Sequence, residues 1–257
     1  MNPALTFLAF TLSAQAAAQV GHPHSESGTR PPGVEKSVKT HALEAGAKVL
    51  QNNGPLGKFD VYIVGFHPMK EHPEQQLEAH HYCHQINEDF AQCVLFDGNT
   101  SRANMHGVEY IISERLFETL PAEERKFWHP HNAEILSGQL VAPGLPAPAE
   151  KAFMRSKLNS YGKTWHVWKT GHKGQADDAL PIGMPMLAWS FNRDGEALPG
   201  LVEERDKKLR IDSMKKRKER ADLVASAKPQ SGVDDLKGKF SRPTRDIPGV
   251  RSIAPPR

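Results

Sequence analysis

The chain has 257 residues, of which 38% are apolar, 25% charged and 7% aromatic, and its net charge is +3 at neutral pH. This apolar share is enough for a hydrophobic core and excludes wholesale disorder, while a mean hydropathy of −0.55 excludes a polytopic membrane protein. The small net charge argues against a protein that coats nucleic acid over its whole surface.

The N-terminal end has the pattern of a targeting segment. Residues 4–12 form an apolar run, and Ala16 and Ala18 follow it as an A-x-A pattern. A bilayer crossing takes about 20 apolar residues, so this run predicts a secretory signal peptide over 1–18 and no transmembrane segment. The expected location is then periplasmic or secreted. An apolar N-terminal helix on a cytosolic protein is the alternative.

Residues 19–33 are rich in His, Pro, Ser and Gly and predict a flexible linker.

The segment 34–212 predicts one α+β domain, with a mainly antiparallel sheet flanked by helices, because helices and strands alternate without long βαβ crossovers. Apolar residues recur at helical spacing in one segment, and short β-branched or aromatic runs mark the strands. The expected elements are a helix over 34–52, strands over 58–66, 94–96, 108–112, 164–169 and 186–191, helical turns over 113–124 and a loop over 138–148.

The C-terminal end is basic. Charged residues dominate 201–220 and predict a helix, whereas the prolines and missing periodicity after residue 227 predict disorder. We therefore expect 213–257 to be the basic end of a helix and a disordered tail. Such a tail could contact anionic lipid, and a solvated tail is the alternative. Since no aromatic residue interleaves the basic run, no specific nucleic-acid partner is expected.

The most informative segment is 77–97, which holds both cysteines and three of the 13 histidines. As a helix, it would place His80 and His84 at i and i+4, where they could share a metal ion. As a strand, it would place His80, Tyr82 and His84 on one face, and His81 and Cys83 on the other. The sequence leaves both conformations open.

The strand alternative also brings the two cysteines together. If a three-residue hairpin loop makes Ile86 pair with Phe90, Cys83 lies directly opposite Cys93. Directly opposed residues have Cβ atoms about 4.5–5.5 Å apart, slightly more than a disulfide prefers. A Cys83–Cys93 disulfide is therefore one hypothesis, and two buried free thiols are the other.

Further histidines point to metal ligation, because neutral imidazole is the commonest metal ligand and a carboxylate can complete a site. His129 and His131 form an H-x-H pair, and Glu109 lies inside an apolar strand, where a buried charge needs a partner. Glu78 and Glu134 are further carboxylates. The candidate ligands for a divalent metal ion are His67, His80, His84, His129, His131 and Glu109.

Sequence motifs identify neither a metal nor a reaction. There is no H-E-x-x-H, no G-x-S-x-G and no phosphate-binding glycine loop. A Cys–His nucleophile pair has no supporting local signature. Whether the protein is an enzyme therefore stays open.

Several motifs, taken in chain order, resemble the oil body-associated proteins of plant seeds and their microbial relatives. They cover roughly residues 34–212 and lie at 43–47, 80–83, 87–89, 92–94, 107–113, 120–121, 128–129, 134–138 and 180–183. The family is named for a location, so the resemblance implies a shared fold and no catalytic residues. An exported protein would not meet an intracellular oil body, so the predicted signal peptide departs from the plant pattern.

Three functional hypotheses follow. The first is an exported binding or accessory module with a histidine-lined site for an unknown small ligand. The second is a metal-dependent enzyme that uses the same histidines, with Glu109 or Glu134 as ligand or base. The third is peripheral binding to a lipid surface through the basic tail.

Overall fold

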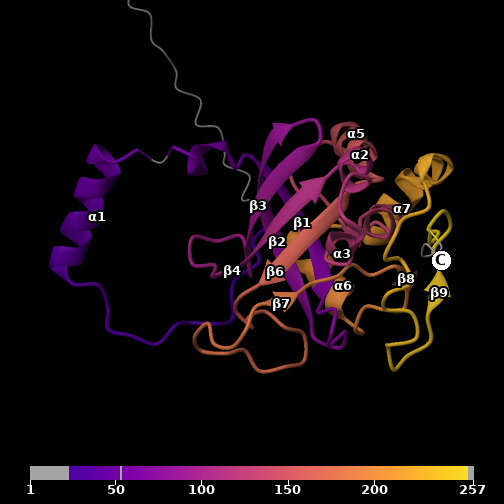
Figure 1. The fold of residues 1–257 in the computed structure, drawn as a ribbon. Coiled ribbons are helices and arrows are strands. Elements are labelled where there is room, and N and C mark those ends of the chain that lie inside the picture. Colours follow the sequence, from indigo (N-terminus) through magenta and orange to yellow (C-terminus); the bar gives the residue numbers. More distant parts are fainter. Residues whose placement is uncertain (1–22, 53, 254–257) are drawn as a thin grey trace, which may run out of the picture.

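The computed structural model describes residues 23–52 and 54–253, and its centre is a curled antiparallel sheet with helices packed against it (Figure 1). The sheet order within the described residues is β1-β2-β3-β4-β6-β5, with β7 beside β6 and every pairing antiparallel. The predicted α+β fold class is confirmed. The predicted signal peptide lies outside the described residues.

The strands of this sheet are β1 (Val61–Pro68), β2 (Gln76–Asn87), β3 (Phe90–Phe96), β4 (Met105–Ile112), β5 (His129–Pro130), β6 (Tyr161–His166) and β7 (Met186–Leu187). A separate two-stranded ribbon joins β8 (Arg193–Asp194) to β9 (Arg245–Asp246). The segment 77–97 is thus a hairpin of β2 and β3, and the helical alternative for it is wrong.

The helices are α1 (Val38–Leu50), α2 (Glu114–Phe117), α3 (Ala122–Arg125), α4 (Asn132–Leu136), α5 (Ala147–Lys157), α6 (Leu201–Leu209) and α7 (Ser213–Glu219), with 3-10 turns η1 (Leu56–Lys58) and η2 (Ala221–Ser226). The expected helix over 201–220 is broken between α6 and α7, where Arg210 adopts a left-handed conformation with φ 54°. The segment 138–148 is mostly loop, as expected, but α5 begins inside it.

The β2–β3 hairpin places the two cysteines opposite each other, as the strand alternative requires. Cys83 pairs with Cys93, and their sulfur atoms form a disulfide with a Cα–Cα distance of 4.0 Å. The loop differs from the expected one, since Asn87 pairs with Phe90 and the register shifts between Gln85 and Asn87. The β-bulge at this point holds one extra residue of β2, which compensates for the shorter loop. Cys83 therefore still lies opposite Cys93.

We expect the disulfide to stabilise the hairpin through the unfolded chain. The double variant Cys83→Ala/Cys93→Ala should lose about 3 kcal/mol of unfolding free energy, because the bond closes a short loop between residues separated by 10 positions. Urea denaturation of the oxidised protein measures this loss, and reduced wild-type protein should match the variant. A loss below about 1 kcal/mol would show that the bond carries no stability.

One face of the curled sheet is buried and forms the main core. Apolar residues of β1, β2, β3 and β4 contact α4 and α5 there, and all five residues of α4 are buried. The inward residues include Ile63, Cys83, Ala91, Cys93, Leu95 and Ile111. Because side chains alternate across a strand, the same face also receives the inward polar residues of these strands, and these form the candidate site.

The C-terminal segment differs from the expected disordered tail. Leu223, Ala227 and Ile247 join the main core, while Leu236 and Phe240 pack with Phe66, Trp189 and Phe191 in a second cluster. The basic run is also held in place, because Arg217 pairs with Asp194. Widely spaced apolar residues thus bind this segment to the sheet despite its prolines.

The N-terminal described residues also differ from the expected linker. Ser25, Ser27 and Thr29 are buried, and the Ser27 hydroxyl donates to Asp97 over 2.6 Å. The predicted helix follows as α1, but none of its residues is buried, and it stands away from the sheet (Figure 1). Its apolar side chains are therefore exposed to solvent.

Candidate functional site

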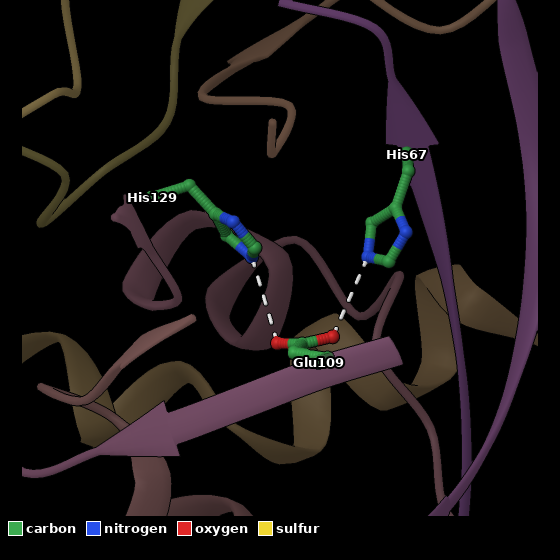
Figure 2. A group of neighbouring side chains, drawn as sticks. All are labelled: His67, Glu109 and His129. Atoms are coloured by element: carbon green, nitrogen blue, oxygen red, sulfur yellow. Dashed lines mark ion pairs between the residues drawn. The ribbon is translucent and has the colours of Figure 1, made fainter. Parts of the chain in front are cut away.

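Three side chains from three separate strands meet inside the curled sheet (Figure 2). Glu109 lies on β4, His67 on β1 and His129 on β5. The Nε2 atom of His67 is 3.8 Å from Glu109 Oε2, and that of His129 is 3.7 Å from Glu109 Oε1. All three residues are buried, and their nitrogen and oxygen atoms lie close enough together to surround one metal ion.

Two more imidazoles contact the same carboxylate. His81 Nε2 is 2.9 Å from Glu109 Oε2, and His131 Nε2 is 3.2 Å from Glu109 Oε1. Glu134, on α4, lies with His129 and His131 in a second group that could hold a metal ion. We call His67, His81, Glu109, His129, His131 and Glu134 the histidine–glutamate cluster.

Two of the residues predicted as ligands do not belong to this cluster. His80 is buried elsewhere, with Nδ1 2.7 Å from the Tyr62 hydroxyl and Nε2 2.9 Å from Glu78. His84 is half-buried and contacts Phe59 edge-on. The reason is strand alternation, because β2 directs His80 and His84 to one face and His81 to the face that carries Glu109.

His81 does belong to the cluster, on the face opposite to His80 that the strand alternative gives it. A further residue gave no sequence signal. Gly162, on β6, lies directly beneath the cluster, and a Cβ atom there would be 2.6 Å from His131 Nε2 and in collision with Glu109 Oε1. Only glycine leaves room for the carboxylate and the imidazoles to meet at this point.

Hydrogen bonds at the outer nitrogens orient two of the imidazoles. His81 Nδ1 lies 3.1 Å from the Ala79 carbonyl, which can only accept, so this nitrogen carries the proton. The Ser160 hydroxyl donates to the Lys157 carbonyl and lies 2.8 Å from His131 Nδ1, so it accepts from that nitrogen. In their neutral forms, both rings therefore direct an Nε2 lone pair at Glu109.

Burial and charge set the protonation of the cluster. Burial opposes ionisation of Glu109, but the surrounding imidazoles, His131 and His81 above all, hold its pKa well below the ordinary value. Burial lowers the pKa of His129 to about 3 and that of His67 well below its ordinary value. Burial, with the nearby Glu109 charge, raises the pKa of Glu134 well above its ordinary value. At neutral pH Glu109 is thus a carboxylate, Glu134 is a carboxylic acid, and the His67 and His129 rings are neutral.

A second row of imidazoles lies behind His67. His67 Nδ1 is 2.9 Å from His166 Nε2, and the His166 ring lies 4.6 Å from that of His106, centroid to centroid. Both rings are fully buried, and neither nitrogen of His106 has a hydrogen-bond partner among the described residues. A hydrogen bond from His67 Nδ1 to His166 would leave His67 Nε2 free to bind a ligand.

We expect the metal-free protein to lose stability on acidification. The folded chain holds His106 and His129 at a pKa of about 3, whereas an ordinary histidine has a value of 6.5. Between these values the unfolded chain binds more protons than the folded chain, so stability falls as the pH drops from 6.5 toward 3. Urea midpoints at successive pH values measure this. A constant midpoint would contradict the assignment of neutral rings.

The fold and the cluster define a class of protein: an α+β domain whose curled antiparallel sheet encloses a buried set of imidazoles and carboxyl groups. Residues 53–224 match the family described as a protein of unknown function, DUF1264. The chain is 32% identical to oil body-associated protein 1B of Arabidopsis thaliana, over 84% of this chain and 86% of the relative. It is 35% identical to oil body-associated protein 1A of Zea mays, over 80% and 83% of the two chains.

The chain therefore belongs to the oil body-associated protein family. No solved structure matches it. The predicted periplasmic or secreted location is wrong. The relatives are named for oil bodies, and an oil body is neither a periplasmic nor a secreted location. Within the described ranges, no helix has both the length and the apolar character that a bilayer crossing requires.

Proposed function

We propose that the protein binds one divalent transition-metal ion in the histidine–glutamate cluster. The ligands are His67 and His129 through Nε2 and Glu109 through its carboxylate, with His81 and His131 beside the same carboxylate. Metal–ligand bonds of about 2.1 Å place neighbouring ligand atoms about 3.0–3.4 Å apart. The nitrogen–oxygen distances of 2.9–3.8 Å around Glu109 bracket this range.

The observation that carries the proposal is the orientation of His81 and His131. Their Nδ1 protons are committed to Ala79 and Ser160, so each ring, in its neutral form, presents an Nε2 lone pair to the Glu109 carboxylate. Two lone pairs facing a buried anion repel it unless a cation lies among them. A metal ion held by Glu109 places a positive charge beside both lone pairs and the carboxylate. A proton on one ring would satisfy only one contact.

The donor set also indicates the kind of metal. Imidazole nitrogen suits zinc, iron, nickel and copper, whereas calcium and magnesium prefer oxygen ligands throughout. The neutral Glu134 carboxyl beside His129 and His131 adds a proton donor next to the ion. Metal-dependent catalysis is accordingly the second form of this proposal, with Glu134 as general acid.

Metal analysis of the purified full-length chain tests the proposal. We expect close to one transition-metal ion per chain, or a raised melting temperature when zinc, iron, nickel or copper is added to chelator-treated protein. Calcium and magnesium serve as controls and should have no effect. Protein that carries no metal and is stabilised by none of these ions would refute the proposal.

A second candidate function is attachment to a lipid surface, and the helix α1 favours it. Val38, Val49 and Leu50 are 82–86% exposed, and Val34, just before the helix, is fully exposed. Exposed apolar side chains on one helix favour the interface of a lipid layer. The relatives' names link them to oil bodies.

Lipid attachment through the basic C-terminal segment has less support. Lys216 and Arg220 pair with Glu150, and Arg217 pairs with Asp194, so these charges are already neutralised. Flotation with phospholipid-coated triglyceride droplets separates the two routes. We expect Val38→Asp/Val49→Asp to lose binding and Lys215→Gln/Lys218→Gln to retain it. The reverse result would return the role to the basic segment.

A further inference from the structure

A narrow pocket, which we call the channel, extends from the histidine–glutamate cluster toward the surface. His67, His81, Glu109, His131 and Glu134 line its inner end, and Gln85 and Lys157 line its outer end. Gln85 is exposed, whereas the residues of the inner end are all buried. The channel therefore points from the buried cluster to one side of the molecule, between β2 and α5.

The wall of the channel is apolar. Between the two ends it is lined by Val61, Ile63, Ala91, Ile111, Leu140 and Phe153, together with the disulfide-bonded Cys83. No charged side chain lies along this wall between Lys157 and the cluster. A charged solute would lose its hydration here without gaining a partner, so the wall favours uncharged molecules.

The channel is also small. It leaves about 20 Å³ for the centre of a water molecule, which is room for about one such molecule. Sites for drug-sized or chain-like ligands enclose about 300 Å³ or more. At the outer end, Lys157 Nζ donates to Gln85 Oε1 over 2.7 Å, and this bond joins α5 to β2 across the opening.

We propose that the centre binds, as its exchangeable ligand, an uncharged molecule with one or two non-hydrogen atoms, of the size of water, dioxygen or hydrogen peroxide. This inference rests on the proposed metal site. The apolar wall disfavours ions, and the small volume excludes organic ligands. Phe153, at the half-buried part of the wall, limits the size of what enters.

Nitric oxide is the probe, because it is uncharged, diatomic and gives a characteristic electron paramagnetic resonance signal when it binds ferrous iron. Full-length protein is loaded anaerobically with Fe(II), and nitric oxide is added. We expect the ferrous–nitrosyl signal in stoichiometric amount. Imidazole and dodecanoate, added to Co(II)-loaded protein, should leave its visible absorption unchanged.

Phe153→Ala should widen the channel, so that imidazole now changes the visible absorption of the Co(II)-loaded protein. Phe153→Leu is a milder variant that keeps the core filled. Phe127→Ala, in a different cluster, is the matched control and should behave as wild type. Binding of Fe(II) without a nitrosyl signal would overturn the inference alone, as would a wild-type response to imidazole or dodecanoate. Failure of both metals to bind would overturn the proposed metal site and this inference with it.

Discussion

Replacing Gly162 by alanine is expected to abolish metal binding without removing a single ligand. The added Cβ would lie 2.6 Å from His131 Nε2 and 2.7 Å from His129 Cε1, and would collide with Glu109. These neighbours are two imidazole rings and a carboxylate. All three lie within contact of the added Cβ, so all three must move to make room for it. A shift of a few tenths of an ångström in each ligand is enough to spoil the metal geometry.

The measurement is the metal content of the purified variant, together with its urea midpoint. Overpacking a buried site costs about 1–3 kcal/mol, so we expect a folded but less stable protein. Gly46→Ala on α1 is the control, because a Cβ there meets nothing within 4 Å. Wild-type metal content in Gly162→Ala would show that the ion, if bound, lies elsewhere.

The sequence contains enough information for part of this site. Alternation along β2 separates His80 from His81, and a hairpin between 77 and 97 pairs Cys83 with Cys93, as the structure shows. Glu109, alone inside an apolar strand, is the residue whose burial needed an explanation, and it is the centre of the cluster. Side-chain alternation therefore predicts which face of the sheet a residue occupies, provided that the segment is known to be a strand and not a helix.

The remaining features depend on contacts that are distant in sequence. His129 reaches Glu109 because β5 pairs with β6 next to β4, and no local pattern specifies this order. The burial of Leu223 and Leu236 likewise depends on surfaces formed by strands far along the chain. For α1 the opposite holds. Its apolar spacing correctly predicts a helix, yet the described residues offer that stripe no partner.

Replacing Glu109 by glutamine should remove metal binding and leave the metal-free fold intact. The amide has nearly the same shape, carries no charge, and its NH₂ group can donate to the Nε2 lone pair of His81 or His131. We expect metal affinity to fall by at least about 100-fold. Changing a residue that only hydrogen-bonds to a ligand already costs about 10–100-fold, and here a charged ligand itself is lost. The rise in melting temperature on metal addition should disappear.

The same variant separates a metal ion from a proton as the cation of the cluster. If Glu109 instead pairs with an imidazolium ring, Glu109→Gln strands a buried charge and costs about 3–5 kcal/mol of stability. Glu78→Gln is the matched control, since Glu78 contacts His80 at 2.9 Å outside the cluster. Lost metal binding with an unchanged urea midpoint supports the metal site, and a strongly lowered midpoint in metal-free protein supports the ion pair. Because the two outcomes differ in the metal-free state, the result does not depend on which metal the protein prefers.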